Sequence, residues 1–386
     1  MSRKELFFIY LCASFAAANT AFSQTWNQMN VASNSRPAIA CSADGKLILA
    51  AVTGGRIYVS TNSGTTWQSN TFARNWGAVA ASADGTRLAA SDSAFGIYIS
   101  TNSGTTWNIN TAPSRNWRAL ACSADGTRLI AAAFGDQVYR STDSGSNWTP
   151  LPLGAGYSWQ CVASSADGNT LAAGRADSSF GIYTSTNGGV NWTTNKLPFY
   201  CMAVASSADG TRLAAAILGN QICTSTNSGA TWITNATPLQ SWKSLASSAD
   251  GSNLVAASYN GSAGQIYTST NAGANWTQNT IDSQDWTQVA MSADAGLMLA
   301  AASGTAPLYD SRTVVAPTLN IDVSGTNVLV SWLVPSTNFV VQQNTNLGSP
   351  NWETLTNQPS LNLGNLHDEL YLAPTNSAGF YRLTTP

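Results

Sequence analysis

The sequence predicts an all-β fold built from repeats, on three observations. A unit of about forty residues recurs seven times between Gln24 and Arg312. Each unit holds short runs in which apolar and polar residues alternate, the pattern of strands with one buried face. Turn-forming residues separate these runs, as in the Ser-Ala-Asp-Gly turn that ends at Gly126. Four strands per unit at this period are typical of a β-propeller, and we predict seven blades.

The second full unit shows how one blade is organised. Its innermost strand is predicted over Trp76–Ser82, its second over Arg87–Ser91, its third over Gly96–Thr101 and its outermost over Thr106–Asn110. Small residues alternate along the innermost strand, which suits the crowded axis. The turn after this strand recurs in every unit, and Asp and Gly there favour a tight hairpin. We therefore predict a structural role for its aspartates: Asp44, Asp84, Asp125, Asp167, Asp209, Asp250 and Asp294.

The seventh unit, Trp286 to Arg312, lacks an outermost strand. The segment Gln24-Thr25-Trp26-Asn27 matches the outermost-strand pattern of the other units. We predict that this N-terminal strand completes the seventh blade, with Trp26 beside a strand over Leu308–Arg312. Closing the ring in this way removes exposed strand edges.

Residues 1–23 have the layout of a secretory signal peptide. Arg3 and Lys4 precede an apolar run from Leu6 to Ala18, and small residues end the segment at Ser23, after which we predict cleavage. No later apolar run reaches transmembrane length. The sequence therefore predicts an exported chain, secreted, periplasmic or at the cell surface, with no transmembrane segment.

The repeats occupy residues 24–315, and residues 316–386 have a different texture. Short alternating runs in this second part predict a small β-sandwich-like domain. The run Asn344–Gly348 through Trp352, with Gly379–Leu383 at the end, resembles a terminal domain of some bacterial secreted repeat proteins. That resemblance implies a role in surface attachment, export sorting or capping.

Composition excludes several classes of function. Charged residues make up 9% of the chain, whereas about 25% is usual, and the formal net charge is −2. Such a chain has no field to attract nucleic acid or an acidic membrane. Apolar residues make up 44%, which is ample for a core. We predict a monomer without a cofactor.

The cysteines do not form a metal-binding pattern. Five remain after cleavage, and an odd number at these spacings argues against a disulfide framework. Cys41 and Cys122 fill a slot that Ala81 and Ser164 fill in other units, which indicates small core residues. Cys161 and Cys201 lie in neighbouring units and are the one pair placed to bridge; the sequence leaves open whether they do.

A second turn, between the third and outermost strands, carries a family resemblance. It reads Ser60-Thr-Asn-Ser-Gly-Thr-Thr-Trp67, and its copies end at Trp107, Trp148, Trp192, Trp232 and Trp276. These turns resemble the Asp-box, or bacterial neuraminidase repeat, of sialidase-like propellers. The aspartate position holds asparagine except at Asp143, which argues against metal binding. In that family the box is a fold element distant from the active site, so the resemblance implies a structural role.

Sequence variation between the units is confined to one face of the predicted ring. That face carries the loops between second and third strands and the loops that lead to each innermost strand. Two interpretations of its aromatic residues remain open: a stacking platform for a sugar or another flat ligand, or wedges between blades that every copy needs. We favour wedges, because five near-identical copies resemble packing more than selection for one ligand. The candidate ligand-binding residues are Trp76, Trp117, Trp159, Trp242, Trp286, Arg36, Arg74 and Arg115.

An enzymatic function has little support in the sequence. The whole propeller lacks glutamate and histidine, which removes the sialidase machinery and histidine-dependent triads. Some Asp-box glycosidases use two aspartates, which leaves loop carboxylates as acid and nucleophile candidates. These are Asp92, Asp136, Asp177 and Asp285, each in a different blade.

The sequence therefore predicts an exported, non-catalytic propeller that binds a glycan or protein partner on the variable face. The resemblance extends to non-enzymatic propellers such as photosystem assembly factors and sorting receptors, which implies protein partners. An aspartate-dependent glycoside hydrolase is the alternative. It would require two carboxylates facing each other across a cleft at roughly 5 to 9.5 Å.

Overall fold

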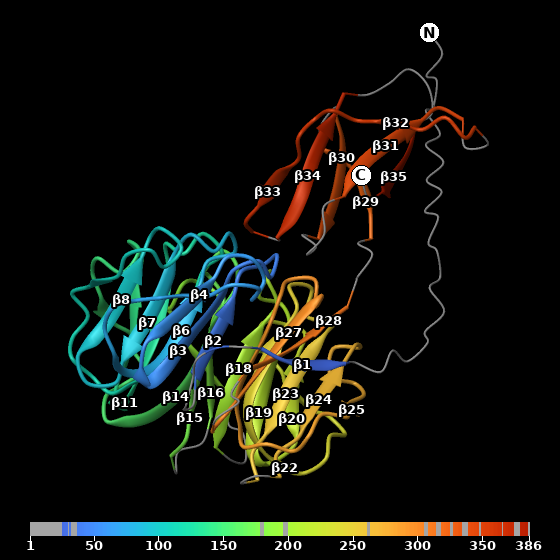
Figure 1. Cartoon of the computed structure of the whole chain (residues 1–386). Coiled ribbons are helices and arrows are strands. Elements are labelled where there is room, and N and C mark those ends of the chain that lie inside the picture. Colours follow the sequence, from blue (N-terminus) through green and yellow to red (C-terminus); the bar gives the residue numbers. More distant parts are fainter. Residues whose placement is uncertain are drawn as a thin grey trace.

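The computed structural model describes residues 25–29, 31, 37–177, 181–195, 200–260, 263–304, 308–313, 318–324, 327–333, 339–346, 349–364, 366–373 and 379–384. In this part of the chain every regular element is a β-strand (Figure 1). The predicted signal peptide and the start of the second part lie outside the described residues, so the boundaries at residues 23 and 316 stay predictions.

Within the described ranges, the repeats form seven antiparallel four-stranded blades, as predicted. Consecutive innermost strands contact each other all the way around the ring, and the last contacts the first. From the axis outward, blade 1 is β2 (Pro37–Cys41), β3 (Ile48–Gly55), β4 (Ile57–Ser60), β5 (Gln68–Ser69); blade 2 is β6 (Arg74–Ala81), β7 (Leu88–Asp92), β8 (Gly96–Ser100), β9 (Asn108–Ile109); and blade 3 is β10 (Trp117–Cys122), β11 (Leu129–Asp136), β12 (Val138–Ser141), β13 (Thr149–Pro150). Blade 4 is β14 (Tyr157–Ser164), β15 (Leu171–Arg175), β16 (Ile182–Ser185), β17 (Thr193–Asn195); and blade 5 is β18 (Cys201–Ser206), β19 (Leu213–Asn220), β20 (Ile222–Ser225), β21 (Ile233–Thr234). Blade 6 is β22 (Gln240–Ser247), β23 (Leu254–Ser258), β24 (Ile266–Ser269), β25 (Thr277–Gln278); and blade 7 is β26 (Trp286–Met291), β27 (Leu297–Ala302), β28 (Leu308–Arg312), β1 (Trp26–Gln28).

The N-terminal strand closes the ring, which confirms the prediction. Trp26 pairs with Ser311 and Gln28 with Tyr309, so β1 is the outermost strand of blade 7. The indole N–H of Trp26 donates to the Asn279 side chain of blade 6 at 3.3 Å. Figure 1 shows β1, in blue, beside the orange strands β27 and β28.

A second closure runs around the axis through the Ser-Ala-Asp-Gly turns. The backbone N–H of each turn alanine donates to the carbonyl of the alanine in the next blade, at 2.7–2.9 Å. The seventh donates back to the first, so the bonds form an unbroken circle, here called the alanine ring. Inside each turn the serine hydroxyl donates to the aspartate, as Ser82 does to Asp84 at 2.6 Å. The alanine ring consists of Ala43, Ala83, Ala124, Ala166, Ala208, Ala249 and Ala293.

The blades alternate in the length of one hairpin, which the repeat did not predict. The second strand has eight residues in β3, β11 and β19 but five in β7, β15 and β23. Each long strand turns at a glycine with positive φ, such as Gly135 at 72°, and its end pairs with the innermost strand of the next blade. Blades 1 and 2, 3 and 4, and 5 and 6 are thereby joined into continuous sheets.

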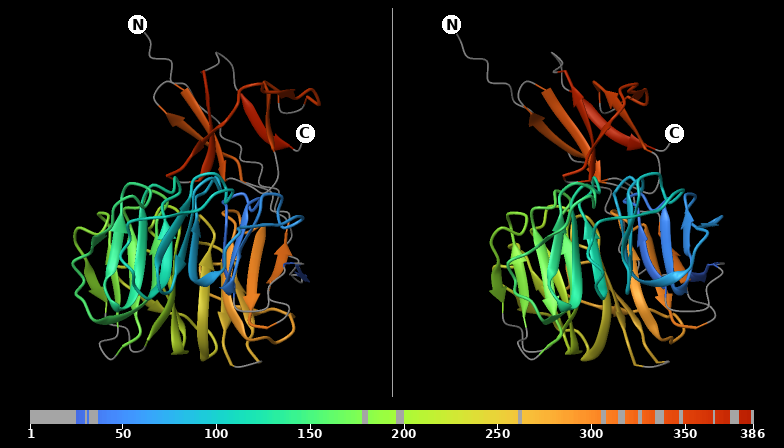
Figure 2. Two further views of the ribbon diagram at one scale, coloured as in Figure 1. Left: turned by 60° about the vertical axis from the view of Figure 1, so that its left-hand side comes forward. Right: turned by 90° about the vertical axis from the view of Figure 1, so that its left-hand side faces the viewer.

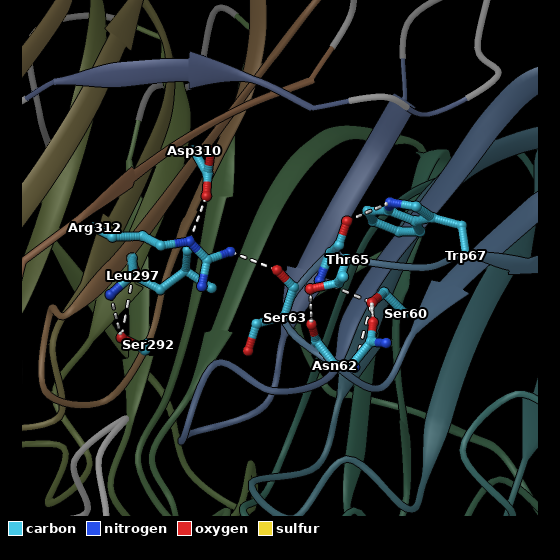
Figure 3. Close-up of polar contacts among 10 residues, drawn as sticks. Ser60, Asn62, Ser63, Thr65, Trp67, Ser292, Leu297, Asp310 and Arg312 are labelled. Atoms are coloured by element: carbon cyan, nitrogen blue, oxygen red, sulfur yellow. Dashed lines mark hydrogen bonds and ion pairs between the residues drawn. The ribbon is translucent and has the colours of Figure 1, made fainter.

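The second turn of each of blades 1 to 6 is a self-contained hydrogen-bonded unit. In blade 1 the Asn62 side chain accepts from the Ser60 hydroxyl at 2.9 Å and from the Thr66 N–H at 2.8 Å. The half-buried Trp67 donates its indole N–H to the Gly64 carbonyl at 3.1 Å. Figure 3 shows this turn, together with Arg312 of blade 7 reaching its Ser63 carbonyl.

Residues after the propeller form two further antiparallel sheets around a small core. They are β29 (Asn320–Ser324), β30 (Asn327–Leu333), β34 (His367–Leu372) and β33 (Ser360–Asn362) in one, and β32 (Glu353–Thr354), β31 (Val340–Asn344) and β35 (Phe380–Thr384) in the other. The core contains the buried Val330, Trp332 and Val341.

The C-terminal sheets sit over one mouth of the propeller. Leu333 and Leu366 pack against the alanine ring. Both views of Figure 2 place these sheets, in orange and red, above one face of the ring. Because the alanine ring lies at the turns between first and second strands, the opposite face, with its variable loops, stays uncovered by them.

Candidate functional site: the loop face of blades 2 to 4

The five tryptophans that begin the innermost strands are buried. Each is at most 1% exposed, and each meets a third-strand tyrosine edge-on, with ring centroids 5.2–5.4 Å apart. No ligand can stack on a ring without exposed area. The stacking-platform interpretation of these rings is therefore corrected, and the structure agrees with wedges between blades. The residues concerned are Trp76, Trp117, Trp159, Trp242 and Trp286.

Other aromatic rings on the same face are exposed instead. Phe95 is 55% exposed, Phe134 42% and Tyr157 36%. They come from blades 2, 3 and 4 in turn. Phe95 lies in the loop between β7 and β8, Phe134 at the end of β11, and Tyr157 at the start of β14. Two further exposed rings on this face, Tyr200 and Tyr259, belong to blades 5 and 6. Large exposed rings gathered on one face mark a surface suited to binding.

Each of the three rings in blades 2 to 4 lies against an arginine. The guanidinium carbon of Arg74 lies 5.0 Å from the Phe95 ring centroid, and that of Arg118 lies 5.1 Å from Phe134. The corresponding distance from Arg175 to Tyr157 is 3.5 Å. Cation–π contacts of this kind hold an arginine flat against a ring and pre-order both side chains. We call Arg74, Phe95, Arg115, Arg118, Phe134, Tyr157 and Arg175 the Arg–aromatic surface.

The surface is continuous across the three blades. The Ser114 hydroxyl of the loop leading into blade 3 donates to the Phe95 carbonyl at 3.0 Å. The adjacent Arg115 forms an ion pair with Asp136. Asp136 is in turn the strand partner of Tyr157, where the long hairpin of blade 3 joins blade 4. The joined sheets of blades 3 and 4 therefore fix the spacing between the second and third rings.

Carboxylates neutralise most of the arginines on this surface. Asp177 makes two hydrogen bonds with the buried Arg175, at 2.8 and 3.1 Å, and also accepts from the Ser158 N–H. Asp92 is 1% exposed and lies 3.8 Å from Arg74 Nε, although neither that nitrogen nor Asp92 Oδ2 has a hydrogen-bond partner among the described residues. Arg118 is exposed and has no ion pair within the described residues, so it gives the surface a local positive charge.

The predicted site residues fall into three groups. The tryptophans are buried, Arg74 and Arg115 lie on the Arg–aromatic surface, and Arg36 lies outside the described residues. The four candidate catalytic aspartates remain in separate blades: Asp92 and Asp136 end strands β7 and β11, whereas Asp177 and Asp285 lie outside the strands. The fourth, Asp285, accepts a hydrogen bond from Ser303 rather than facing one of the others.

Metal and membrane sites are not evident in the described part of the chain. No group of three or more His, Cys, Asp or Glu side chains there could hold a metal ion. Across the same residues, no helix has the length and hydrophobicity to cross a bilayer. The Cys161 and Cys201 sulfurs lie 3.7 Å apart as free thiols.

Sequence reasoning missed Phe95, Arg118, Phe134 and Tyr157. The signal was a residue type that changes at one slot from blade to blade, between small residues and bulky ones such as Phe134 and Tyr259. Phe134 occupies the position of Ser93 and Ala176, because the backbone N–H of each donates to the residue before an innermost-strand tryptophan. The tryptophans drew attention because they recur in five units. They recur because packing between blades requires them.

Comparison with known proteins supports the fold. No protein-family profile and no curated protein matches the sequence. Among solved structures, YCF48 from Cyanidioschyzon merolae is similar at 14% identity and a TM-score of 0.59, covering 74% of this chain and 98% of that one. A structure of YCF48 bound to D1 peptide matches at 16% identity and 0.57, covering 75% and 95%.

Two other kinds of protein share the architecture. The Cps50 (Swd1) β-propeller domain of Myceliophteria thermophila matches at 14% identity and a TM-score of 0.60, covering 75% of this chain and all of that one. A GH74 xyloglucanase from Xanthomonas campestris matches at 13% and 0.58, and this chain covers 59% of it. At such identities the similarity establishes a β-propeller fold and nothing finer.

Proposed function

We propose that this chain is an exported, non-catalytic propeller that binds a polypeptide partner through the Arg–aromatic surface. The observation that carries the proposal is the set of three exposed rings, each ordered by an arginine, on the face that the C-terminal sheets leave open. Aromatic residues and arginine are enriched at protein interfaces and dominate their binding energy. One similar propeller, YCF48, has been solved with a bound peptide, which supports a protein partner.

A glycan partner has less support, because its proposed platform was the ring of tryptophans. The glycosidase alternative draws on the similar GH74 propeller, but it needs two carboxylates across a cleft. Here Asp92, Asp136 and Asp177 each lie against an arginine of the Arg–aromatic surface. These three aspartates are accounted for by their role in neutralising and ordering the arginines.

The test is binding of the purified exported chain to a peptide library and to a glycan array. A Phe95→Ala, Phe134→Ala double variant should weaken peptide binding at least tenfold, the size of effect at interface hot spots. The matched control is Ile109→Ala, Ile233→Ala, which removes two apolar side chains that are at least as exposed, from outermost strands. It should bind like the parent chain.

Three outcomes would contradict the proposal. Peptide binding that survives in the double variant would place the site elsewhere. Selective glycan binding would replace the partner class. Release of reducing sugar from polysaccharides, abolished by Asp92→Asn or Asp136→Asn, would establish the hydrolase instead.

A further inference from the structure

Three departures from the repeat meet at one point between blades 4 and 5. Cys201 stands where five other blades have a tryptophan. Cys161, on β14, stands where the same register position in other blades has a small or polar residue: Ala38, Ala78, Ala119, Ala203, Ser244 and Gln288. Gly174, the strand partner of Cys161, stands where other blades have alanine or serine: Ala51, Ser91, Ala132, Ala216, Ala257 and Ala301.

The glycine makes room for both sulfurs. A Cβ atom at Gly174 would lie 2.5 Å from Cys161 Sγ and 2.6 Å from Cys201 Sγ, closer than real Cβ atoms approach. The two sulfurs are 3.7 Å apart, and the residues are 6% and 0% exposed. The three substitutions therefore act together, because the alanine used elsewhere would displace the two thiols.

We propose that Cys161 and Cys201 form a disulfide that joins the innermost strands of blades 4 and 5 when the exported chain folds under oxidising conditions. A disulfide has an S–S distance of about 2.05 Å, so the sulfurs must approach by roughly 1.7 Å. The two side chains already point at each other across neighbouring strands. This inference does not depend on the proposed binding function.

The reaction is thiol–disulfide exchange with an external disulfide, such as oxidised glutathione or a protein dithiol oxidase. One cysteine thiolate attacks the oxidant's disulfide and releases one thiolate. The second cysteine then attacks the mixed disulfide, forms the Cys161–Cys201 bond and releases the other thiolate. Two thiols lose two electrons and two protons, and the oxidant is reduced to two thiols.

The bond must form during folding. In the folded chain the hydrogen bond with Cys161 and burial raise the pKa of the Cys201 thiol, which suppresses the attacking thiolate. Burial also shields the pair from bulky oxidants. A chain folded under reducing conditions should therefore keep both thiols, even if oxidant is added later.

The decisive measurement uses the unmodified mature chain. It is refolded with reduced and oxidised glutathione, denatured, alkylated and digested for mass spectrometry. We expect three alkylated cysteines of five and one cross-linked peptide pair containing residues 161 and 201. Five alkylated cysteines, or a cross-link through Cys223, would overturn the proposal.

Thermal unfolding gives a second measurement. The chain refolded with oxidant should melt roughly 5 °C higher than the chain refolded with reductant, as expected for a bond closing a loop of this length in a protein of this size. A Cys161→Ala, Cys201→Ala variant should show no such difference. The control variant Cys41→Ala, Cys122→Ala should retain it, and a retained difference in the first variant would contradict the assignment.

Discussion

At the scale of single residues, the buried tryptophans differ in one hydrogen bond. The indole N–H of Trp242 donates to the Asn220 carbonyl at 2.8 Å, whereas the Trp286 N–H is buried without a partner in the described structure. The rings are otherwise alike, fully buried and edge-on to a tyrosine. The long hairpin of blade 5 supplies the acceptor for Trp242, and blade 6 has no such hairpin to offer Trp286.

This difference predicts unequal responses to the same substitution. Trp242→Phe should lower the free energy of unfolding by about 2 kcal/mol more than Trp286→Phe. The first substitution leaves the Asn220 carbonyl without its donor, whereas the second removes an indole N–H that has no acceptor in the described structure. Equilibrium denaturation of both variants measures the difference. Equal losses would mean that water satisfies the Trp286 N–H.

The sequence predicted where these rings begin each innermost strand, but not whether they are exposed. Periodicity reports which positions are alike, and packing between blades requires the same residue in every copy. A binding surface needs positions that differ, such as Phe95 and Phe134, and one sequence does not show which of its irregularities are exposed. Trp26 was assigned to its strand because its local pattern repeats an outermost strand, which is why that prediction was confirmed.

At the scale of elements, the Ser-Ala-Asp-Gly turns link stability to pH. Burial alone would raise the pKa of the Asp84 carboxyl, but hydrogen bonds from Ser82 and Thr86 outweigh it and lower that pKa below 3.8. The same holds for four further turns, at Asp125, Asp167, Asp209 and Asp250. A lowered pKa in the folded state stabilises the fold above the unfolded pKa, near 4, and this stabilisation disappears as pH falls through the folded pKa.

We therefore expect the loss of stability between about pH 4 and pH 2.5 to be shallower in an Asp84→Asn, Asp209→Asn variant than in the parent chain. Urea midpoints measured across this range test it. Asp282→Asn, which removes an exposed charge outside these turns, is the control. If the double variant has the same pH slope as the parent chain, the turn aspartates bind equal numbers of protons in the folded and unfolded states.

The alternation of long and short hairpins also belongs to the element scale. The turn glycines at 54, 135 and 219 have positive φ, which a tight hairpin requires. Their two-blade spacing is present in the sequence. It was not recognised from the sequence, because the long strands are explained only by their pairing with the next blade, and that pairing is a long-range contact.

At the scale of the whole molecule, ring closure depends on a strand of three residues. Trp26→Ala should lower the unfolding free energy by about 2 kcal/mol, because it removes a half-buried ring and its bond to Asn279. Replacing the exposed Gln28 by alanine is the matched control.

Deleting residues 24–28 should also free the edge of β28 and produce dimers or aggregates on size-exclusion chromatography. A monomeric, equally stable deletion variant would contradict this.

The packing of the C-terminal sheets against the alanine ring gives another prediction for the whole molecule. Leu333→Asp with Leu366→Asp should release the C-terminal sheets and speed proteolysis between residues 313 and 318, because burying a charge there is unfavourable. Leu361→Asp, on an exposed strand of the same sheets, should not. Binding on the loop face should be unchanged in both, since it lies at the opposite mouth.

The geometry of the closing strand also determines how the ring responds to mechanical force. In the antiparallel pair, Trp26 faces Ser311, so the chain enters β1 and leaves β28 at the same end of the seam. Tension between the two termini therefore peels the hydrogen bonds one after another instead of loading them together. The ring is held closed both by β1 and by the alanine ring. Tension along this line should nevertheless open it at low force, with blade 7 opening before any other.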